Sequence, residues 1–237
     1  MKIISKCILS ALLLSTSVYS TSCTDKEIIQ EMEQQTQSKS LIRTQASILS
    51  ANSYSDISVG IYRSQSKFKY AYQHLKQKPG ECSWTSYVCA VAAIRRGNGL
   101  SYEVNYPKVT RVRNACNNSS YITKIKWFAE NYDDRSTYLT APTSQFQAVK
   151  NMINHLDTYQ SPFLIIGKVS GISHYRTVWS INWQGSIYNS TVYYTDTLNP
   201  TESNINNQFK PINFAAFLAN MRSGSSFGGH NMLFIGN

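Results

Sequence analysis

The sequence predicts an α+β domain in which helices come first and an antiparallel β-sheet follows. Apolar residues recur with a helical period in three segments, residues 83–97, 120–131 and 144–156. Runs typical of strands follow at residues 163–169, 174–182 and 186–196, and a late helix and a closing strand are expected at 213–222 and 230–235. The turn Trp-Gln-Gly at residues 183–185 predicts a hairpin, and therefore antiparallel pairing of the strands beside it.

The chain begins with a segment that predicts export. Residues 1–6 carry two lysines, residues 7–18 are mainly apolar, and small residues follow at Ser20 and Ser22. This pattern is typical of a secretory signal peptide, and its apolar part is too short to span a membrane. We therefore expect residues 1–22 to be removed.

Cys23 directly follows the predicted signal peptide and precedes the polar residues 24–27. Its setting resembles a bacterial lipoprotein cleavage site, although that pattern prefers leucine where Ser20 stands. We expect Cys23 to carry the lipid anchor of a cell-envelope lipoprotein. Ordinary cleavage near Ser20 or Ser22, which would yield a secreted protein, is the alternative.

The rest of the chain predicts a tether followed by one domain. Residues 23–59 are rich in serine, threonine and glutamine, whereas residues 60–237 hold the apolar periodic segments. The formal charge of the full chain is +10, and removal of the signal peptide with its two lysines would leave +8. The sequence shows no nucleic-acid motif, so we read these charges as solvated faces and expect no specific nucleic-acid partner. The four histidines share no metal-ligand spacing, and no metal or other cofactor is expected.

Cys82 is the candidate nucleophile. It stands where the first long helix begins, directly after a turn predicted at Pro79 and Gly80. The unpaired N–H groups and the dipole at a helix N-terminus favour a thiolate, which is the reactive form of cysteine. A cysteine in this position can attack a carbonyl carbon and hold the acyl group as a thioester.

Two further cysteines of the domain have structural interpretations. Cys89 lies two helical turns beyond Cys82, so these two thiols cannot reach each other for a disulfide. A bridge between Cys89 and Cys116 is one option in an oxidising compartment, and Cys82 would then be the odd thiol left over. We favour the other option, in which Cys89 is a small buried apolar residue of the helix.

A base and an orienting acid are predicted at the open end of the hairpin. His174 begins one of its strands and Asp196 ends the other, so the carboxylate can hold one imidazole nitrogen while the second accepts a proton from Cys82. Gln77 lies five residues before Cys82. Its amide can donate a hydrogen bond beside the Cys82 backbone N–H and complete an oxyanion hole.

Other residues compete for two of these roles. His230, after two glycines, is an alternative base, although no strand that carries a carboxylate follows it. Asn182 is an alternative to Asp196, although it lies beside the hairpin turn at the far end of the His174 strand.

The order cysteine, histidine, aspartate and the surrounding strings resemble the papain-like cysteine peptidases. Within them the chain is similar to a small bacterial group that includes bacteriocin-leader peptidases and plant-pathogen avirulence proteases. The resemblance covers about residues 60–237 and rests on Gln77 and on residues 81–84, 144–156, 161–167, 173–175, 196–200 and 212–221. It implies a papain-like fold, in which an N-terminal helical part carries the nucleophile and packs on a C-terminal antiparallel sheet.

The same resemblance implies a role for each candidate residue. Cys82 would be the nucleophile, His174 the base, Asp196 the orienting acid and Gln77 the oxyanion donor. Two features depart from the family pattern. Ser83 stands after the nucleophile, where relatives usually have glycine or tryptophan, and the spacing of the glutamine varies in the family, which keeps Gln73 as an alternative donor.

The sequence therefore predicts a cysteine peptidase that cleaves a peptide or protein substrate through a thioester acyl-enzyme. A transglutaminase-like acyl transferase with the same triad is one alternative. A catalytically silent surface lipoprotein, which uses the scaffold for binding, is the other.

Overall fold

The computed structural model describes residues 54–169, 172–198, 205–222 and 232–236. The predicted signal peptide, Cys23 and most of the predicted tether lie outside the described residues, as does His230. The folded part already includes Tyr54, whose ring packs on those of Phe146 and Trp183. Tyr54 therefore contacts the domain although it lies in the predicted tether.

A seven-stranded antiparallel sheet organises the described part of the chain. Its strands are β1 (Gly60–Arg63), β2 (Thr137–Thr140), β3 (Phe163–Val169), β4 (Ile172–Trp183), β5 (Thr191–Thr195), β6 (Lys210–Asn213) and β7 (Met232–Ile235). Six of them lie in the order β2-β7-β3-β4-β5-β6, and β1 pairs with β4 off this path. β3 pairs with the first half of β4 and β1 with its last residues, while β5 takes the other edge of β4. The register of β4 and β5 shifts at Trp179, which marks a β-bulge.

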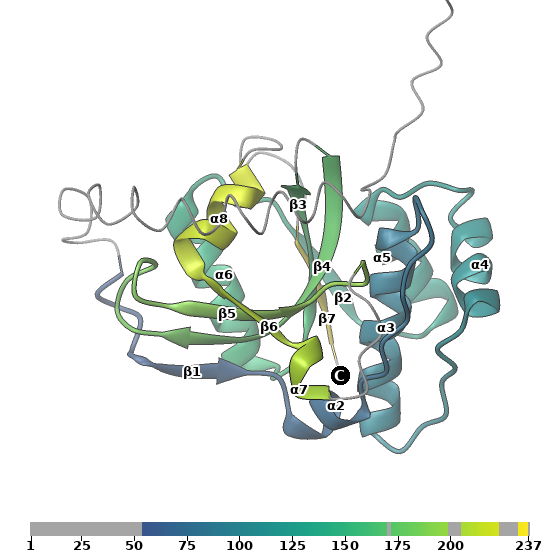
Figure 1. Cartoon of the computed structure of the whole chain (residues 1–237), viewed down its shortest axis with the longest axis horizontal. Coiled ribbons are helices and arrows are strands. Elements are labelled where there is room, and N and C mark those ends of the chain that lie inside the picture. The colour runs from purple at the N-terminus through teal and green to yellow at the C-terminus, as the bar shows by residue number, and fades with distance from the viewer. Residues whose placement is uncertain (1–53, 170–171, 199–204, 223–231, 237) are drawn as a thin grey trace, which may run out of the picture.

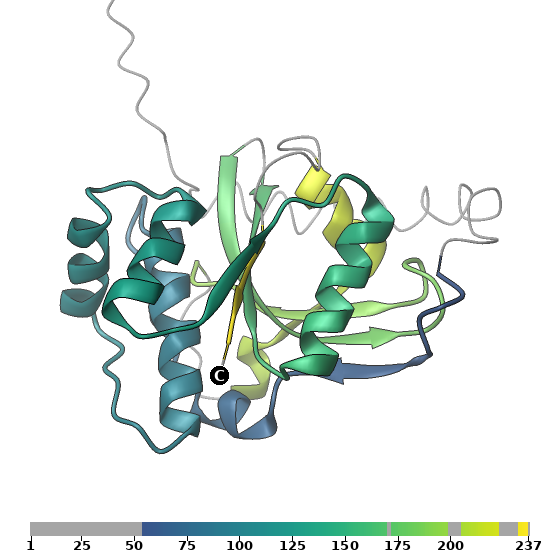
Figure 2. The same ribbon diagram turned by 180° about the vertical axis from the view of Figure 1, so that it is seen from behind.

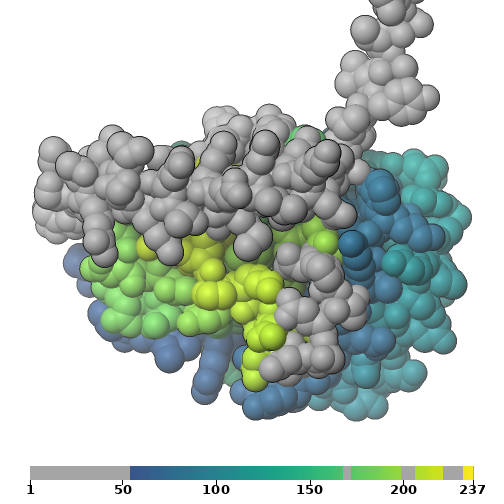
Figure 3. All heavy atoms as spheres, viewed as in Figure 1, coloured from purple at the N-terminus to yellow at the C-terminus, as the bar shows by residue number. Residues whose placement is uncertain are grey.

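The helices lie on two sides of this sheet. They are α2 (Ser66–Ala71), α3 (Cys82–Gly97), α4 (Tyr106–Ala115), α5 (Ile122–Tyr132), α6 (Gln145–Thr158), α7 (Ile205–Gln208) and α8 (Phe214–Arg222). Figure 1 shows α3, α4 and α5 grouped at one side, with α3 nearest to the strands, and α6 and α8 at the other side. Figure 2 shows the same division from behind. In the space-filling view the teal helical side lies at the right and the green strands at the left, with the blue atoms of β1 and α2 along the lower edge (Figure 3).

Two apolar clusters fill the space between these layers. All residues of α3 from Cys82 to Ile94 are buried, because this helix lies between the sheet and the outer helices α4 and α5. The second cluster joins α6 and α8 to the strands, with Leu156, Phe163 and Phe217 among its members. No helix in the described ranges is both long enough and apolar enough to cross a bilayer.

Most of the predicted elements are confirmed. α3, α5 and α6 lie within a few residues of the predicted helices, and β3 has the predicted bounds. Ser144 caps α6 by accepting a hydrogen bond from the Gln147 N–H over 3.1 Å. The mixed architecture agrees with the expected α+β class.

The tight hairpin turn predicted at residues 183–185 is wrong. β5 begins only at Thr191, and a longer loop precedes it. Ser190 closes this loop, because its Oγ accepts from the Gln184 N–H over 2.8 Å and donates to the Ser186 carbonyl over 2.6 Å. Ile187 is buried in the second apolar cluster, so the loop is held by packing as well as by hydrogen bonds.

Candidate active site

Cys82 is the first residue of α3 and is 6% exposed. The turn before it contains Gly80 with φ +80°, a left-handed conformation that glycine adopts without strain. Glu81 occupies the N-cap position but makes no capping hydrogen bond, and its carboxylate pairs instead with Arg113 on α4 over 2.9 Å. The N-cap side chain therefore leaves the first N–H groups of α3 available beside the thiol.

His174 and Asp196 form a buried pair at neighbouring strands. His174 lies near the start of β4, and Asp196 directly follows β5. Nε2 of His174 is 2.8 Å from Oδ1 of Asp196, and both residues are buried. Oδ1 also accepts from the Leu198 N–H over 3.0 Å, and Nε of Arg176 donates to Oδ2 over 3.3 Å.

The charge of Asp196 follows from these contacts. Burial by itself would raise the pKa of the Asp196 carboxyl, but His174, then Arg176 and the Leu198 N–H, hold that pKa well below its usual range. An ionised carboxylate only accepts hydrogen bonds, so Nε2 of His174 carries the hydrogen of this contact. Nδ1 is then the nitrogen that can exchange a proton with a thiol.

The first turns of α3 contact both the segment of β4 that carries His174 and the segment after β5 that carries Asp196. Ser86, one turn after Cys82, donates to the Tyr175 carbonyl over 3.4 Å, and its Oγ lies 3.3 Å from Oγ1 of Thr197. Tyr175 follows His174 and Thr197 follows Asp196 in the chain. Burial, and next the neighbouring Cys82, raise the pKa of the Tyr175 phenol well above its ordinary value. The N-terminal end of α3 therefore meets the strand ends that carry His174 and Asp196.

Gln77 is tied to the residue that follows Asp196. Its backbone N–H donates to the Thr197 carbonyl over 2.8 Å, and its Oε1 accepts from the Thr197 hydroxyl over 2.7 Å. Nε2 of Gln77 is buried and has no hydrogen-bond partner in the described ranges. An unsatisfied buried donor costs about 1–3 kcal/mol, and such a group calls for a functional explanation.

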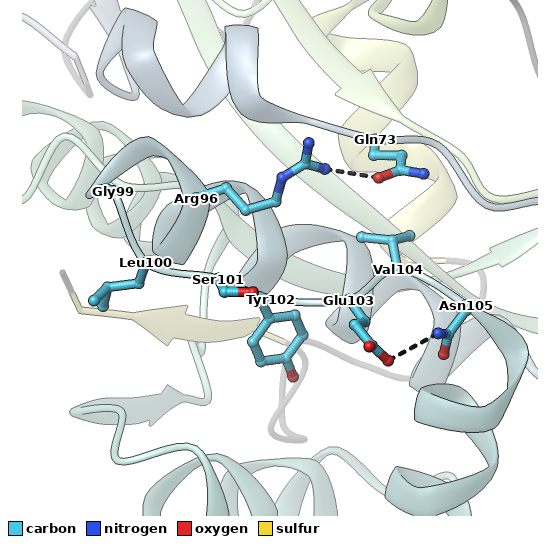
Figure 4. Close-up of a pocket in the computed structure, with 9 residues that line it drawn as sticks. All are labelled: Gln73, Arg96, Gly99, Leu100, Ser101, Tyr102, Glu103, Val104 and Asn105. Carbon is cyan, nitrogen blue, oxygen red and sulfur yellow. Dashed lines mark hydrogen bonds between the residues drawn. The ribbon is translucent and has the colours of Figure 1, made fainter.

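Gln73 lies elsewhere. It is exposed, and its Oε1 accepts from Nη1 of Arg96 over 2.7 Å at the rim of an open pocket formed with residues 99–105 (Figure 4). Arg96 is 14 residues beyond Cys82 on the same helix, which places it about 21 Å away along the axis. The structure thus brings Gln77, and not Gln73, to the end of α3 where Cys82 lies.

Asn182 is also remote from His174. It pairs with Thr191 at the other end of β4, and its Oδ1 accepts from Nε2 of Gln184 over 2.7 Å. Eight residues of extended strand separate it from His174, which corresponds to about 26 Å.

The three cysteines of the described ranges are free thiols, so the structure contains no bridge between Cys89 and Cys116. Burial raises the pKa of Cys89 to about 12 and that of Cys116 to about 11. Both are therefore neutral, unreactive thiols near neutral pH.

Two residues that contact the candidate site residues, Arg176 and Thr197, were not predicted from the sequence. Arg176 lies two positions after His174, and the period of a strand could have placed both on one face. Thr197 had no such signal, because its contact with Gln77 joins segments 120 residues apart. Among the described residues, no group of three or more histidine, cysteine, aspartate or glutamate side chains could hold a metal ion.

No protein-family model and no curated protein matches the sequence. Among solved structures, the crystal structure of UfSP from C. elegans aligns with a TM-score of 0.52 at 13% identity. The alignment covers 79% of this chain and 36% of UfSP, so the chain spans about a third of the length of this neighbour. UfSP is a cysteine protease of papain-like fold. The likeness supports a papain-like cysteine-peptidase fold for the present chain, and at this identity it concerns the fold alone.

Proposed function

We propose that the papain-like fold of this chain carries an active cysteine peptidase. The observation that carries the proposal is the buried contact of 2.8 Å between His174 and an ionised Asp196, on strand ends that contact the first turns of the helix begun by Cys82. A buried carboxylate costs desolvation free energy when it is ionised, so the place of Asp196 and His174 beside a helix N-terminus with a thiol favours a catalytic role over a structural one.

The proposed reaction has two halves. The Cys82 thiolate attacks the carbonyl carbon of a peptide bond, the C–N bond breaks, and His174 gives its proton to the leaving amine. Water then attacks the thioester and gives a proton to His174, the C–S bond breaks, and the acid product leaves. The backbone N–H of Cys82 and Nε2 of Gln77 stabilise the oxyanion in both halves.

The substrate and location are part of the proposal. The predicted signal peptide and Cys23 support an exported lipoprotein that acts on peptides or proteins outside the cytoplasm. The resemblance of the sequence strings to small bacterial leader and avirulence peptidases supports the same class of substrate.

The test is incubation of the purified protein with a library of natural peptides, followed by mass spectrometry of new chain ends. Cys82→Ala is the matched inactive variant, and Cys116→Ala is the control for loss of a buried thiol. Hydrolysis that depends on Cys82 supports the peptidase. Products joined to an added amine, with no hydrolysis, would identify an acyl transferase, and the absence of any product that depends on Cys82 would point to a silent binding scaffold.

A further inference from the structure

Arg176 is a buried arginine beside the candidate triad. It lies two residues after His174 on β4, so the two side chains lie on the same face of the strand. They contact different oxygens of Asp196, His174 at Oδ1 over 2.8 Å and Arg176 at Oδ2 over 3.3 Å. The guanidinium of Arg176 also lies over the ring of Tyr194, 5.0 Å from its centroid.

The charge of His174 changes during thioester chemistry, whereas that of Asp196 does not. After His174 has given its proton to the leaving amine, it is neutral, and the sulfur of Cys82 is bonded to the acyl carbon. In the second half, His174 must accept a proton from the attacking water. The products are the carboxylic acid, the Cys82 thiolate and protonated His174, so atoms and charges balance.

When His174 is neutral, other groups must stabilise the negative charge of the buried Asp196 carboxylate. In the described ranges, the titratable groups that interact electrostatically with Asp196 are His174, Arg176 and Tyr72. Burial raises the pKa of the Tyr72 phenol well above its ordinary value, so this residue stays neutral. Cys82, at the start of α3, contributes no charge at this stage because its sulfur is bonded in the thioester. An arginine keeps its proton in proteins, so the positive charge of Arg176 persists through the whole cycle.

We propose that Arg176 is a positioning residue that pairs with Asp196 while His174 is neutral, and so keeps His174 able to accept the proton of water. This inference rests on the proposed function of Cys82, His174 and Asp196 and adds a residue to that site. Without the guanidinium, the buried carboxylate would favour protonated His174 more strongly. Hydrolysis of the acyl-enzyme would then require a higher pH, at which His174 is neutral.

The experiment uses p-nitrophenyl acetate, which acylates a reactive cysteine without requiring a particular peptide sequence. Acylation of Cys82 releases nitrophenolate in a burst, and hydrolysis of the acetyl-enzyme sets the steady rate that follows. The variants are Arg176→Gln, which removes the charge, and Arg176→Lys, which retains it. Arg63→Gln is the control, because Arg63 is an exposed arginine on β1.

For Arg176→Gln we expect a burst of normal amplitude and a steady rate reduced about tenfold at pH 6, which recovers by pH 9. Arg176→Lys and Arg63→Gln should keep the wild-type pH dependence. A folded Arg176→Gln protein whose steady rate is unchanged, or is lowered equally at every pH, overturns the role of Arg176. If Arg176→Gln does not fold, Arg176→Lys tests the proposal. A shifted pH dependence of the steady rate in a folded Arg176→Lys protein would overturn the role of Arg176 too.

The wild-type burst separates this inference from the proposed function. A burst that Cys82→Ala abolishes supports the nucleophile and the thioester of the proposed function, whatever the arginine variants then show. The absence of any nitrophenolate release that depends on Cys82 in the wild-type protein overturns the proposed function and the role of Arg176 together.

Discussion

Cys82 occupies a buried place at the start of α3 where a small side chain fits. We predict that Cys82→Ala abolishes peptide cleavage and lowers the free energy of unfolding by no more than about 1 kcal/mol. The reason is that alanine removes the nucleophilic sulfur but keeps helix propensity. Cleavage assays and thermal unfolding of the same preparation measure both effects. A variant that retains full activity would mean that Cys82 is a core thiol only.

Thr197 holds the amide of Gln77 through its hydroxyl. We predict that Thr197→Val, which keeps the shape but removes that hydrogen bond, lowers the rate of acylation roughly tenfold. This is less than the 10²–10³ expected when an oxyanion donor is lost outright. Thr197→Ser should restore most of the rate, because serine supplies the same donor.

The burst rate with p-nitrophenyl acetate measures this effect, with Gln77→Ala as the reference for complete loss of the donor. If Thr197→Val acylates as fast as the wild-type protein while Gln77→Ala is slow, the hydroxyl does not position the amide. If neither variant is slow, Gln77 is not the oxyanion donor.

At the scale of elements, α6 packs on the sheet through a buried histidine. His155 stacks on Phe234 at 4.4 Å between ring centroids and meets Phe163 edge-on at 5.6 Å. Burial lowers its pKa from 6.5 to about 4, although the nearby backbone of Ser161 and Pro162 offsets part of this shift. His155 is therefore neutral in the folded protein at neutral pH.

This neutral histidine predicts acid sensitivity. Between pH 6.5 and 4 the unfolded chain binds a proton at His155 that the folded protein excludes, so the free energy of unfolding falls as the pH falls through this window. The loss is about 3 kcal/mol in all. His155→Phe keeps an apolar ring and should remove this part of the pH dependence. Urea unfolding at several pH values measures how the free energy of unfolding changes with pH in the wild-type protein and in His155→Phe. An equal pH dependence in the two proteins would contradict a neutral, buried His155.

The sequence predicted the long elements well because their periods are clear. α3, α6 and β3 have apolar patterns that match one secondary structure over several turns or residues. The missed elements are short or weakly patterned. β1, β2 and β6 have four residues each, and β1 and β2 pair with strands that are distant in the chain, β4 and β7.

α4 was missed although it carries a readable start signal. Asn105 accepts from the Lys108 N–H over 2.9 Å, and Pro107 lies in the first turn. The hairpin failed for a different reason. A Trp-Gln-Gly string suggests a tight turn, but the side chain of Ser190 and the burial of Ile187 favour a longer loop. Such tertiary contacts override local turn chemistry.

At the scale of the whole molecule, the chain combines a papain-like domain with a predicted export segment. If Cys23 is acylated, the positively charged domain stays at a membrane surface. We predict that Cys23→Ser moves the protein from the membrane fraction to the soluble fraction and leaves the activity of the domain unchanged. Ser22→Ala is the matched control, and intact mass measurement would detect the lipid. Membrane fractionation that does not change in Cys23→Ser would exclude the anchor.

The α+β class could be predicted from the order of helices and strands, and the likeness to UfSP supports the expected papain-like fold. Cys82, His174 and Asp196 could be proposed as candidates because each lies at or near the end of a predicted helix or strand, although the strand bounds beside the hairpin were predicted only roughly. The hydrogen-bond network around these residues could not be predicted, because Arg176 and Thr197 contact Asp196 and Gln77 only in the folded protein.

The pH dependence of alkylation by iodoacetamide, mapped to each cysteine by mass spectrometry, tests the proposed triad most directly and needs no substrate. We predict that at pH 6 the reagent labels Cys82 much faster than Cys89 or Cys116, that Asp196→Asn slows this labelling, and that His174→Ala reduces it to the rate of an ordinary thiol. Labelling of Cys82 at pH 6 that is no faster than that of a cysteine in the unfolded chain, or that is unchanged in His174→Ala, would contradict the triad.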